Sequence, residues 1–117
     1  MAYPKTAKLP GGSQVYQLHP DCKKYSLRDY NFVESKSGNF QYDQEVKADF
    51  ASSRAVRLKI TVDKDLSGLK MNVTNQKGLK TVNVFKSEGM ADFIEPLAFI
   101  LEDMEQYKII EKLADED

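Results

Sequence analysis

The stretch SEGMADFIEPLAFILEDMEQYKIIEKLA, residues 87–114, decides the fold. Its apolar residues recur every three or four positions from Met90 to Met104, which places their side chains on one face of a helix. The acidic residues lie mostly off that face, so we predict an amphipathic helix with an acidic outer surface. Residues 107–113 are predicted to be helical too, either without interruption or after a break near Gln106.

The start of this helix has two interpretations. Asp92 and Glu95 have the spacing of a capping box, which would put Pro96 in the first turn, where proline costs little. Ser87 could instead cap an earlier start, and Pro96 would then kink the helix.

In residues 13–86, apolar residues recur with the shorter period that is typical of strands. The clearest strand is predicted at 54–62, where every second residue is apolar. Strands at 69–74 and 79–86 follow it after short turns, which favours an antiparallel meander.

Earlier strands are predicted at 15–18, at 30–33 and from residue 40. The last two form a hairpin around the turn at 35–39. The polar residues 23–29 are ambiguous.

Strands followed by a helix predict an α+β fold, in which one or two mainly antiparallel sheets pack against one long C-terminal helix. The length of 117 residues favours a single domain over 1–117. Residues 1–12 are predicted to be an N-terminal tail and residues 115–117 a frayed acidic tail. The predicted core comprises the apolar faces of the strands and the helix: Val56, Leu58, Ile60, Val62, Leu69, Met71, Val73, Val82, Val84, Phe93, Leu97, Ile100, Leu101 and Met104.

Composition narrows the class of protein. The single cysteine can form no internal disulfide, which favours a reducing, cytoplasmic setting. No run approaches the ~18 apolar residues of a membrane span, so no membrane association is expected. The net charge of −1 argues against a nucleic-acid binder. The oligomeric state is left open.

Charge is nevertheless divided along the chain. Residues 54–86 carry eight lysines and arginines against two acidic residues, and residues 87–117 carry two lysines against ten acidic residues. Solvated surfaces explain this division. The functional alternative is that Arg57, Lys59 and Lys70 form a sheet face that binds carboxylates or phosphates.

The residues suited to catalysis are few. His19 and Cys22 are the only histidine and the only cysteine, three positions apart. A zinc site needs about four ligands, and a nucleophile pair needs a hydrogen bond that a short loop rarely enforces. We therefore expect no metal and no cofactor, and we read this segment as a turn.

Aromatic residues offer one further alternative. Eight of the twelve lie in the N-terminal half, interleaved with basic residues, as in a platform that stacks single-stranded nucleic acid. A hydrophobic core explains the same pattern, and the overall acidity weighs against nucleic acid.

Several segments resemble a small uncharacterised family from lactic-acid bacteria and their relatives. They are YQLHP (16–20), KYSLRD (24–29), residues 32–40 and FIEPL (93–97). The resemblance spans about residues 2–114 and rests on general likeness. It implies an α+β fold of sheets on one main helix. It also implies a role in amino-acid metabolism, through remote fold similarity to prokaryotic S-adenosylmethionine decarboxylases and through neighbouring genes that include a cysteine desulfurase.

The decarboxylase similarity can be compared with particular residues. Those enzymes cleave themselves at a Glu-Ser step, and Glu34-Ser35 is such a dipeptide here. It is followed by Lys36-Ser37-Gly38, which does not match the run in those enzymes, and their catalytic histidine and cysteine have no matched positions. The resemblance therefore makes Glu34 and Ser35 weak candidates for catalysis.

The leading prediction is a non-catalytic accessory or ligand-binding protein in amino-acid or sulfur metabolism. Its partner would be a cysteine desulfurase or another enzyme of amino-acid metabolism. A small enzyme acting on an amino-acid-like substrate and a single-strand nucleic-acid binder are the alternatives. The sequence leaves open whether the protein is an enzyme. Because it has few residues suited to catalysis, we expect that it is not one.

Overall fold

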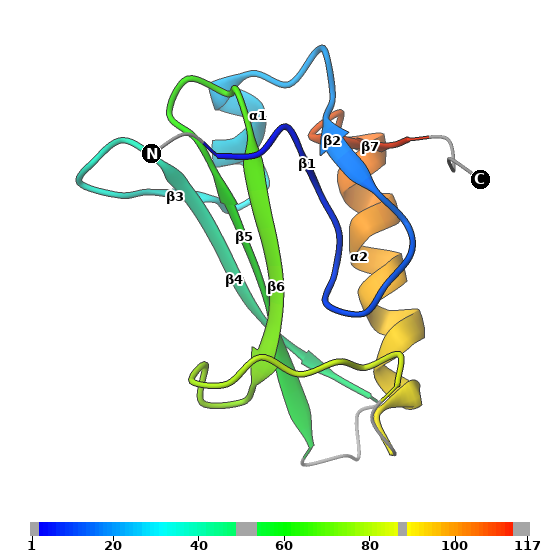
Figure 1. The fold of residues 1–117 in the computed structure, drawn as a ribbon. Coiled ribbons are helices and arrows are strands. Elements are labelled where there is room, and N and C mark those ends of the chain that lie inside the picture. The colour runs from blue at the N-terminus through cyan, green and yellow to red at the C-terminus, as the bar shows by residue number, and fades with distance from the viewer. Residues whose placement is uncertain (1–2, 49–53, 87–88, 114–117) are drawn as a thin grey trace.

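The computed structural model describes residues 3–48, 54–86 and 89–113. These residues form two antiparallel sheets and one main helix, so the α+β prediction is confirmed (Figure 1). Sheet A has the order β1-β2-β7 and sheet B the order β3-β4-β5-β6. The strands are β1 (Thr6–Ala7), β2 (Tyr16–Leu18), β3 (Val33–Glu34), β4 (Phe40–Lys47), β5 (Ala55–Val62), β6 (Leu69–Asn75) and β7 (Ile110–Lys112). The helices are α1 (Lys24–Asp29), the 3₁₀ turn η1 (Ala91–Phe93) and α2 (Ile94–Gln106).

Sheet B is built around β5, which pairs with β4 on one side and β6 on the other. Every second residue of β5, from Val56 to Val62, is buried, as the alternation predicts. The helix α2 contacts β4 of sheet B and β7 of sheet A. Apolar faces of both sheets and of α2 thus share one core.

The predicted core is confirmed. All fourteen predicted residues are buried except Val82 and Ile100, which are partly buried against the core. The core also takes four aromatic residues of the N-terminal half: Tyr16, Phe32, Phe40 and Tyr42. Because these rings are buried, they offer no stacking surface to nucleic acid.

The start of α2 confirms in part the interpretation that places Pro96 in the first turn. Pro96 is the third residue of α2 and therefore lies in its first turn. The predicted capping box does not form, since neither η1 nor α2 has a side-chain cap at its start. A 3₁₀ hydrogen bond from Phe93 N to Met90 O, 3.1 Å long, supplies the first turn instead. Ser87 lies outside the described residues.

The end of α2 corrects the prediction of one long helix to residue 113. The helix ends at Gln106, and residues 110–112 form β7. Lys108 has a φ of 61°, and its N–H donates to Glu105 O while Ile109 N–H donates to Met104 O, each at 3.0 Å. These two bonds are a Schellman motif, which turns the chain out of the helix. The buried side chains of Ile109 and Met104 complete the motif.

Lys108→Gly is expected to raise the free energy of unfolding by about 0.5–1 kcal/mol. Glycine adopts a positive φ without the steric cost that a lysine side chain incurs. Chemical denaturation with urea measures the change. A destabilised variant would contradict the left-handed conformation at this position.

Residues 79–86 also differ from the prediction, because they form no strand. Asn75 Oδ1 accepts a hydrogen bond from Leu79 N at 3.0 Å. Asn83 Oδ1 accepts from the backbone N–H groups of Phe85 and Lys86, at 3.0 and 3.1 Å. Such asparagine turns compete with strand pairing. What remains of the predicted strand is one bridge, between Thr74 and Thr81.

The N-terminal third contains two further differences. The ambiguous residues 23–29 include the helix α1, and the strand predicted at 30–33 is shifted to β3 because residues 30–31 end α1. Within residues 3–12, expected to be a tail, β1 pairs with β2 and Leu9 is buried. Residues 115–117 lie outside the described part.

Within the described residues, every helix is too short or too polar to span a bilayer.

Candidate functional site

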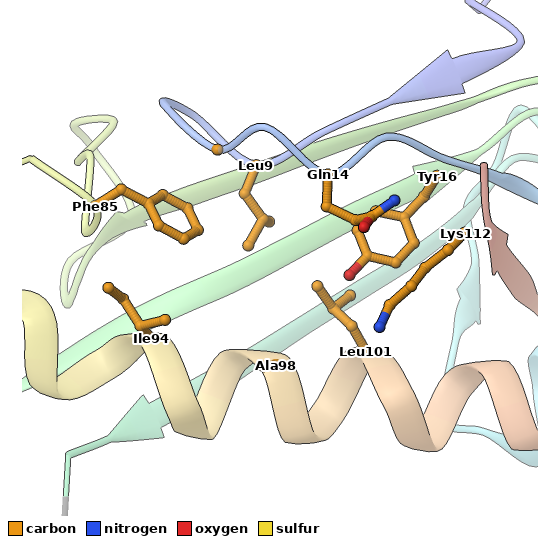
Figure 2. A pocket seen from close by; sticks show the side chains of 9 residues that line it. Leu9, Gln14, Tyr16, Phe85, Ile94, Ala98, Leu101 and Lys112 are labelled. Atoms are coloured by element: carbon orange, nitrogen blue, oxygen red, sulfur yellow. The ribbon is translucent and has the colours of Figure 1, made fainter. Parts of the chain in front are cut away.

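A cavity of about 180 Å³, partly open to solvent, lies beside α2 (Figure 2). Its walls come from the segment before β2, from β2 and β7 of sheet A, from Phe85 and from α2. The lining residues are Leu9, Gly12, Gln14, Tyr16, Phe85, Ile94, Ala98, Leu101 and Lys112. A dry cavity of about 150 Å³ can hold benzene, so this one has room for a small apolar group.

The cavity has an apolar end and a polar end. Leu9, Phe85 and Ile94 lie together at one end in Figure 2. Gln14, Tyr16 and Lys112 lie at the other, where the phenol oxygen and the lysine nitrogen point toward α2. Few polar groups beside an apolar wall are typical of ligand sites.

The pairing of β2 with β7 creates the polar end. Tyr16 lies directly opposite Lys112 in the register, so both side chains project from the same face of sheet A. Gln14 Nε2 donates to the carbonyls of Val15 and Leu113, both at 3.1 Å, which holds its amide in place. Among the described residues, the Tyr16 hydroxyl has no hydrogen-bond partner, and it can bond to a ligand.

Acidic residues of α2 set the electrostatics of this end. Glu105 Oε2 is 3.9 Å from Lys112 Nζ. Burial raises the pKa of Tyr16, and the negative charges of Glu105 and Glu102 raise it further. The phenol is therefore protonated at neutral pH and can donate a hydrogen bond. A cation and a hydroxyl donor thus lie at one end of the cavity, and the carboxylate of Glu105, which is not part of the cavity wall, lies next to the cation.

His19 and Cys22 do not line this cavity. His19 Nδ1 accepts a hydrogen bond from the backbone N–H of Asp21 at 3.0 Å, and Cys22 N donates to His19 O at 2.9 Å, as expected for a turn. Cys22 is buried, and this burial raises its pKa to about 11. The side chain is a thiol at neutral pH, which makes it a poor nucleophile.

Glu34 and Ser35 lie in the β3–β4 hairpin, away from the cavity. Glu34 forms an exposed ion pair with Arg28 at 3.1 Å. Ser35 Oγ is 3.0 Å from Ser37 Oγ, and Ser35 N donates to Asn39 O at 2.7 Å. These contacts describe an ordinary hairpin turn, and a catalytic role of the dipeptide remains a prediction.

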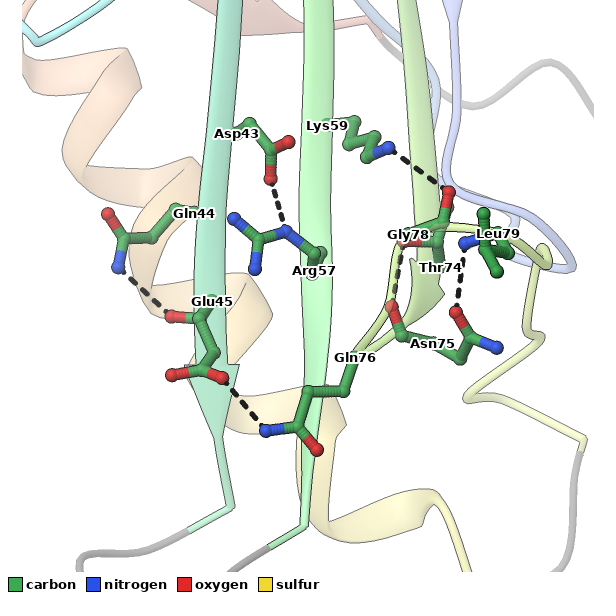
Figure 3. A network of polar contacts seen from close by, with 10 residues as sticks. All are labelled: Asp43, Gln44, Glu45, Arg57, Lys59, Thr74, Asn75, Gln76, Gly78 and Leu79. Atoms are coloured by element: carbon green, nitrogen blue, oxygen red, sulfur yellow. Dashed lines mark hydrogen bonds and ion pairs between the residues drawn. The ribbon is translucent and has the colours of Figure 1, made fainter.

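Arg57 and Lys59 lie on the outer face of sheet B, where each has a partner (Figure 3). Arg57 Nε contacts Asp43 Oδ1 at 2.7 Å, and Lys59 Nζ donates to Gly78 O at 3.3 Å. Lys70 Nζ lies 4.8 Å from the ring centre of Tyr3. An anion on this face would have to compete with these contacts, so the basic face is the weaker candidate site.

Metal ligands do not gather in the described part of the chain, where no three histidine, cysteine or acidic side chains are placed to hold an ion.

The residues of the cavity carry no local signal in the sequence. Tyr16 and Lys112 are far apart along the chain and meet only because β7 is a strand. The prediction of a helix through residue 113 placed Lys112 on a helix surface, so the site could not be found. A strand prediction for residues 110–112 would have allowed such a pairing, but the choice of β2 as the partner depends on the whole fold.

The fold and the cavity define a small α+β protein with two antiparallel sheets and an amphipathic cavity beside its main helix. The family model DUF1831, described as "Putative amino acid metabolism", matches residues 1–111. The chain belongs to this family.

A solved structure supports the assignment. The chain is similar to the crystal structure of a DUF1831 family protein from Lactobacillus plantarum, with 34% sequence identity and a TM-score of 0.84. The match covers 97% of this chain and 99% of that chain. Among curated proteins, none matches this chain. The expected resemblance to the family is confirmed, whereas the remote similarity to S-adenosylmethionine decarboxylases stays a prediction.

Proposed function

We propose that the protein binds a small α-amino acid with an apolar side chain in the cavity beside α2, as a non-catalytic protein of amino-acid metabolism. The observation that carries the proposal is the combination of groups in that cavity. The apolar end accommodates a side chain of about the size of leucine or methionine. The polar end offers Lys112 and Tyr16 to the carboxylate, and Glu105, next to Lys112, is the acidic group proposed for the ammonium.

Each charge of a zwitterion has a counterpart. The carboxylate would accept hydrogen bonds from the Lys112 ammonium and the Tyr16 hydroxyl. The α-ammonium would interact with Glu105, which already lies 3.9 Å from Lys112 Nζ. A simple carboxylic acid has no cation to place beside this carboxylate, whereas an amino acid has one, so the amino acid fits better. The description of the family points to the same class of ligand.

The proposal is tested by titrating the ¹⁵N-labelled protein with L-leucine, L-methionine and L-phenylalanine. We expect chemical-shift changes at residues of the cavity. Isopentylamine lacks the carboxylate and 4-methylpentanoate lacks the ammonium, so both should bind more weakly than leucine. Equal binding of leucine and 4-methylpentanoate would contradict the role of Glu105.

Lys112→Met is expected to weaken leucine binding by about 10- to 100-fold. A hydrogen bond to a charged group contributes about 1.5–3 kcal/mol, and methionine keeps most of the volume of the side chain. Lys77→Met, in the exposed turn after β6, is the matched control and should leave the affinity unchanged. A second variant, Ala98→Leu, should abolish binding, because it places a larger side chain in the cavity. No shift change with any of the three amino acids, or equal affinity in both methionine variants, would overturn the proposal.

A small enzyme acting on an amino-acid-like substrate is the second candidate. The Tyr16 hydroxyl and the Lys112 ammonium, which project from one face of sheet A, are the observation in its favour, since both groups can transfer protons. Mass spectrometry of leucine incubated with the protein distinguishes the two candidates. Unchanged leucine after long incubation supports a binding protein.

The cytoplasmic location and a partner such as a cysteine desulfurase are parts of the same proposal. The buried thiol of Cys22 suits a reducing compartment. Affinity purification from a native lysate, followed by identification of the captured proteins, tests the partner. A capture without any enzyme of amino-acid metabolism counts against it.

A further inference from the structure

The outer edge of β4 is largely unpaired in the described part of the chain, and it lies outside the cavity proposed to bind an amino acid. β3 pairs with β4 only at Phe40 and Gln41. Within the described residues, no strand pairs with Tyr42–Lys47 on that side, whereas β5 pairs with all of β4 on the other. An unpaired edge presents a row of backbone donors and acceptors to another chain.

The register shows which backbone groups face this open edge. Ser35 N donates to Asn39 O in the hairpin turn, and Val33 lies opposite Gln41. By the alternation of antiparallel ladders, Gln41 directs its N–H and C=O toward β3. Glu45 and Lys47, further along the same strand at the same alternation, direct theirs to the same side.

One side chain already occupies this edge. Gln44 Nε2 donates to the backbone carbonyl of Glu45 at 3.0 Å (Figure 3). Gln44 is exposed, although its even-numbered neighbours Tyr42 and Val46 are buried. The amide thus satisfies a carbonyl that the β4–β5 ladder leaves available, and a strand of another molecule could replace it.

A groove runs beside the same edge. It has a volume of about 580 Å³, is open to solvent, and lies between β4 and α2. Its walls include Val46 of β4 and Pro96, Phe99 and Ile100 of α2. The ring of Phe99 is 71% exposed, which is unusual for a phenylalanine in the middle of a helix.

We propose that two copies of this chain associate through the β4 edge, in antiparallel register about a two-fold axis at Val46. In this register Glu45 of each copy lies opposite Lys47 of the other. These are hydrogen-bonded pairs, since the backbone groups of both residues face outward. The pairing joins the two copies of sheet B into one continuous sheet.

Charge complementarity is the reason for proposing a second copy of the chain as the partner of this edge. In one register, Glu45 of each copy lies opposite Lys47 of the other copy, and this register is symmetric. A shift by two residues would put Glu45 opposite Glu45, which is unfavourable, and Lys47 would then meet Asp43, which is already paired with Arg57. A symmetric interface contains the same patch twice, and this patch complements itself. The two Phe99 rings would lie on the same side of the joined sheet, where the groove is.

Charge reversal tests the register directly. The wild-type protein is expected to have twice the 13.3 kDa chain mass in light scattering after size exclusion. Glu45→Lys places two lysines opposite each other in each pair, and Lys47→Glu places two glutamates there. Each single variant should dissociate at least about tenfold more readily than the wild type. An equimolar mixture of the two variants should recover the dimer, because one copy then contributes only lysines at these positions and the other only glutamates. The double variant should recover it as well.

Two controls separate the loss of the interface from other effects of the substitutions. Glu45 also accepts a hydrogen bond from Gln76 Nε2 at 3.1 Å, so Gln76→Ala removes this contact alone and should stay dimeric. Circular dichroism shows whether each variant is folded. A wild-type monomer at all concentrations, variants that remain dimeric, or a mixture that stays monomeric would overturn the proposal. So would a monomer that takes up an extended peptide along β4, which would identify a different occupant.

Discussion

Leu97→Ala is expected to lower the free energy of unfolding by about 2–5 kcal/mol. Leu97 lies in the middle of the apolar face of α2 and is 1% exposed. It belongs to the core that α2 shares with both sheets. The truncation leaves a cavity that rigid neighbours on several elements cannot fill completely, so the cost exceeds the loss of hydrophobic transfer alone.

Leu79→Ala is the matched control, since the same atoms are removed from a side chain that is 83% exposed. We expect a change of less than about 0.5 kcal/mol there. Both values come from urea denaturation followed by circular dichroism. Similar values for the two variants would show that α2 does not contribute this face to the core.

Gly68→Ala should cost about 1–3 kcal/mol, although the backbone of Gly68 is not in a left-handed conformation. A Cβ atom at this position would lie 2.4 Å from Pro4 O and 2.6 Å from Tyr3 O. These are backbone atoms, which cannot rotate away as a flexible side chain would. The substitution would therefore push residues 3–4 away from β6, where Leu69 N donates to Pro4 O at 2.9 Å.

Gly89→Ala separates two destabilising effects of replacing a glycine, the steric clash of the new Cβ atom and the strain of a left-handed backbone. Gly89 has a φ of 78°, and a Cβ atom there would have no neighbour within 4 Å. Its replacement measures the backbone cost alone, about 1 kcal/mol. Hydrogen exchange at Leu69 should accelerate in Gly68→Ala and not in Gly89→Ala. Unchanged exchange in both variants would mean that residues 3–4 do not protect this amide.

The sequence predicts the strands β5 and β6 and the apolar stripe of α2 well because each has an uninterrupted period. In β5, alternate residues from Val56 to Val62 are apolar, and the partner strand β6 repeats the pattern from Leu69. Burial on one face requires this alternation, so the pattern and the structure agree.

The errors arise where a short local interaction outweighs the pattern. Lys108 adopts a left-handed conformation that glycine usually provides, so the composition gives no warning that α2 stops. Asn83 folds residues 83–86 into a turn, although Val82 and Val84 continue a plausible strand pattern. The helix α1 is only six residues long, which is too short for a helical period to be recognised.

The candidate site depends on contacts that no local pattern contains. Of the apolar residues that α2 contributes to it, Leu101 was predicted as core, whereas Ile94 and Ala98 were not. Its polar residues require the register of β2 with β7, which depends on the whole fold. The open edge of β4 is a similar case, since its existence follows from the shortness of β3.

Sheet A also determines the order in which the chain can fold during synthesis. Its middle strand β2 pairs with β1 near one end of the chain and with β7 near the other, and Gln17 Nε2 bonds to Glu111 Oε2 across 94 positions. Sheet B is complete once Asn75 has left the ribosome, whereas β7 begins at Ile110. At a synthesis rate of about 5–20 residues per second, β2 waits roughly 2–7 s for this partner. All strands of sheet B have thus been made while β2 still lacks its partner β7, and chaperones have that interval in which to bind the chain.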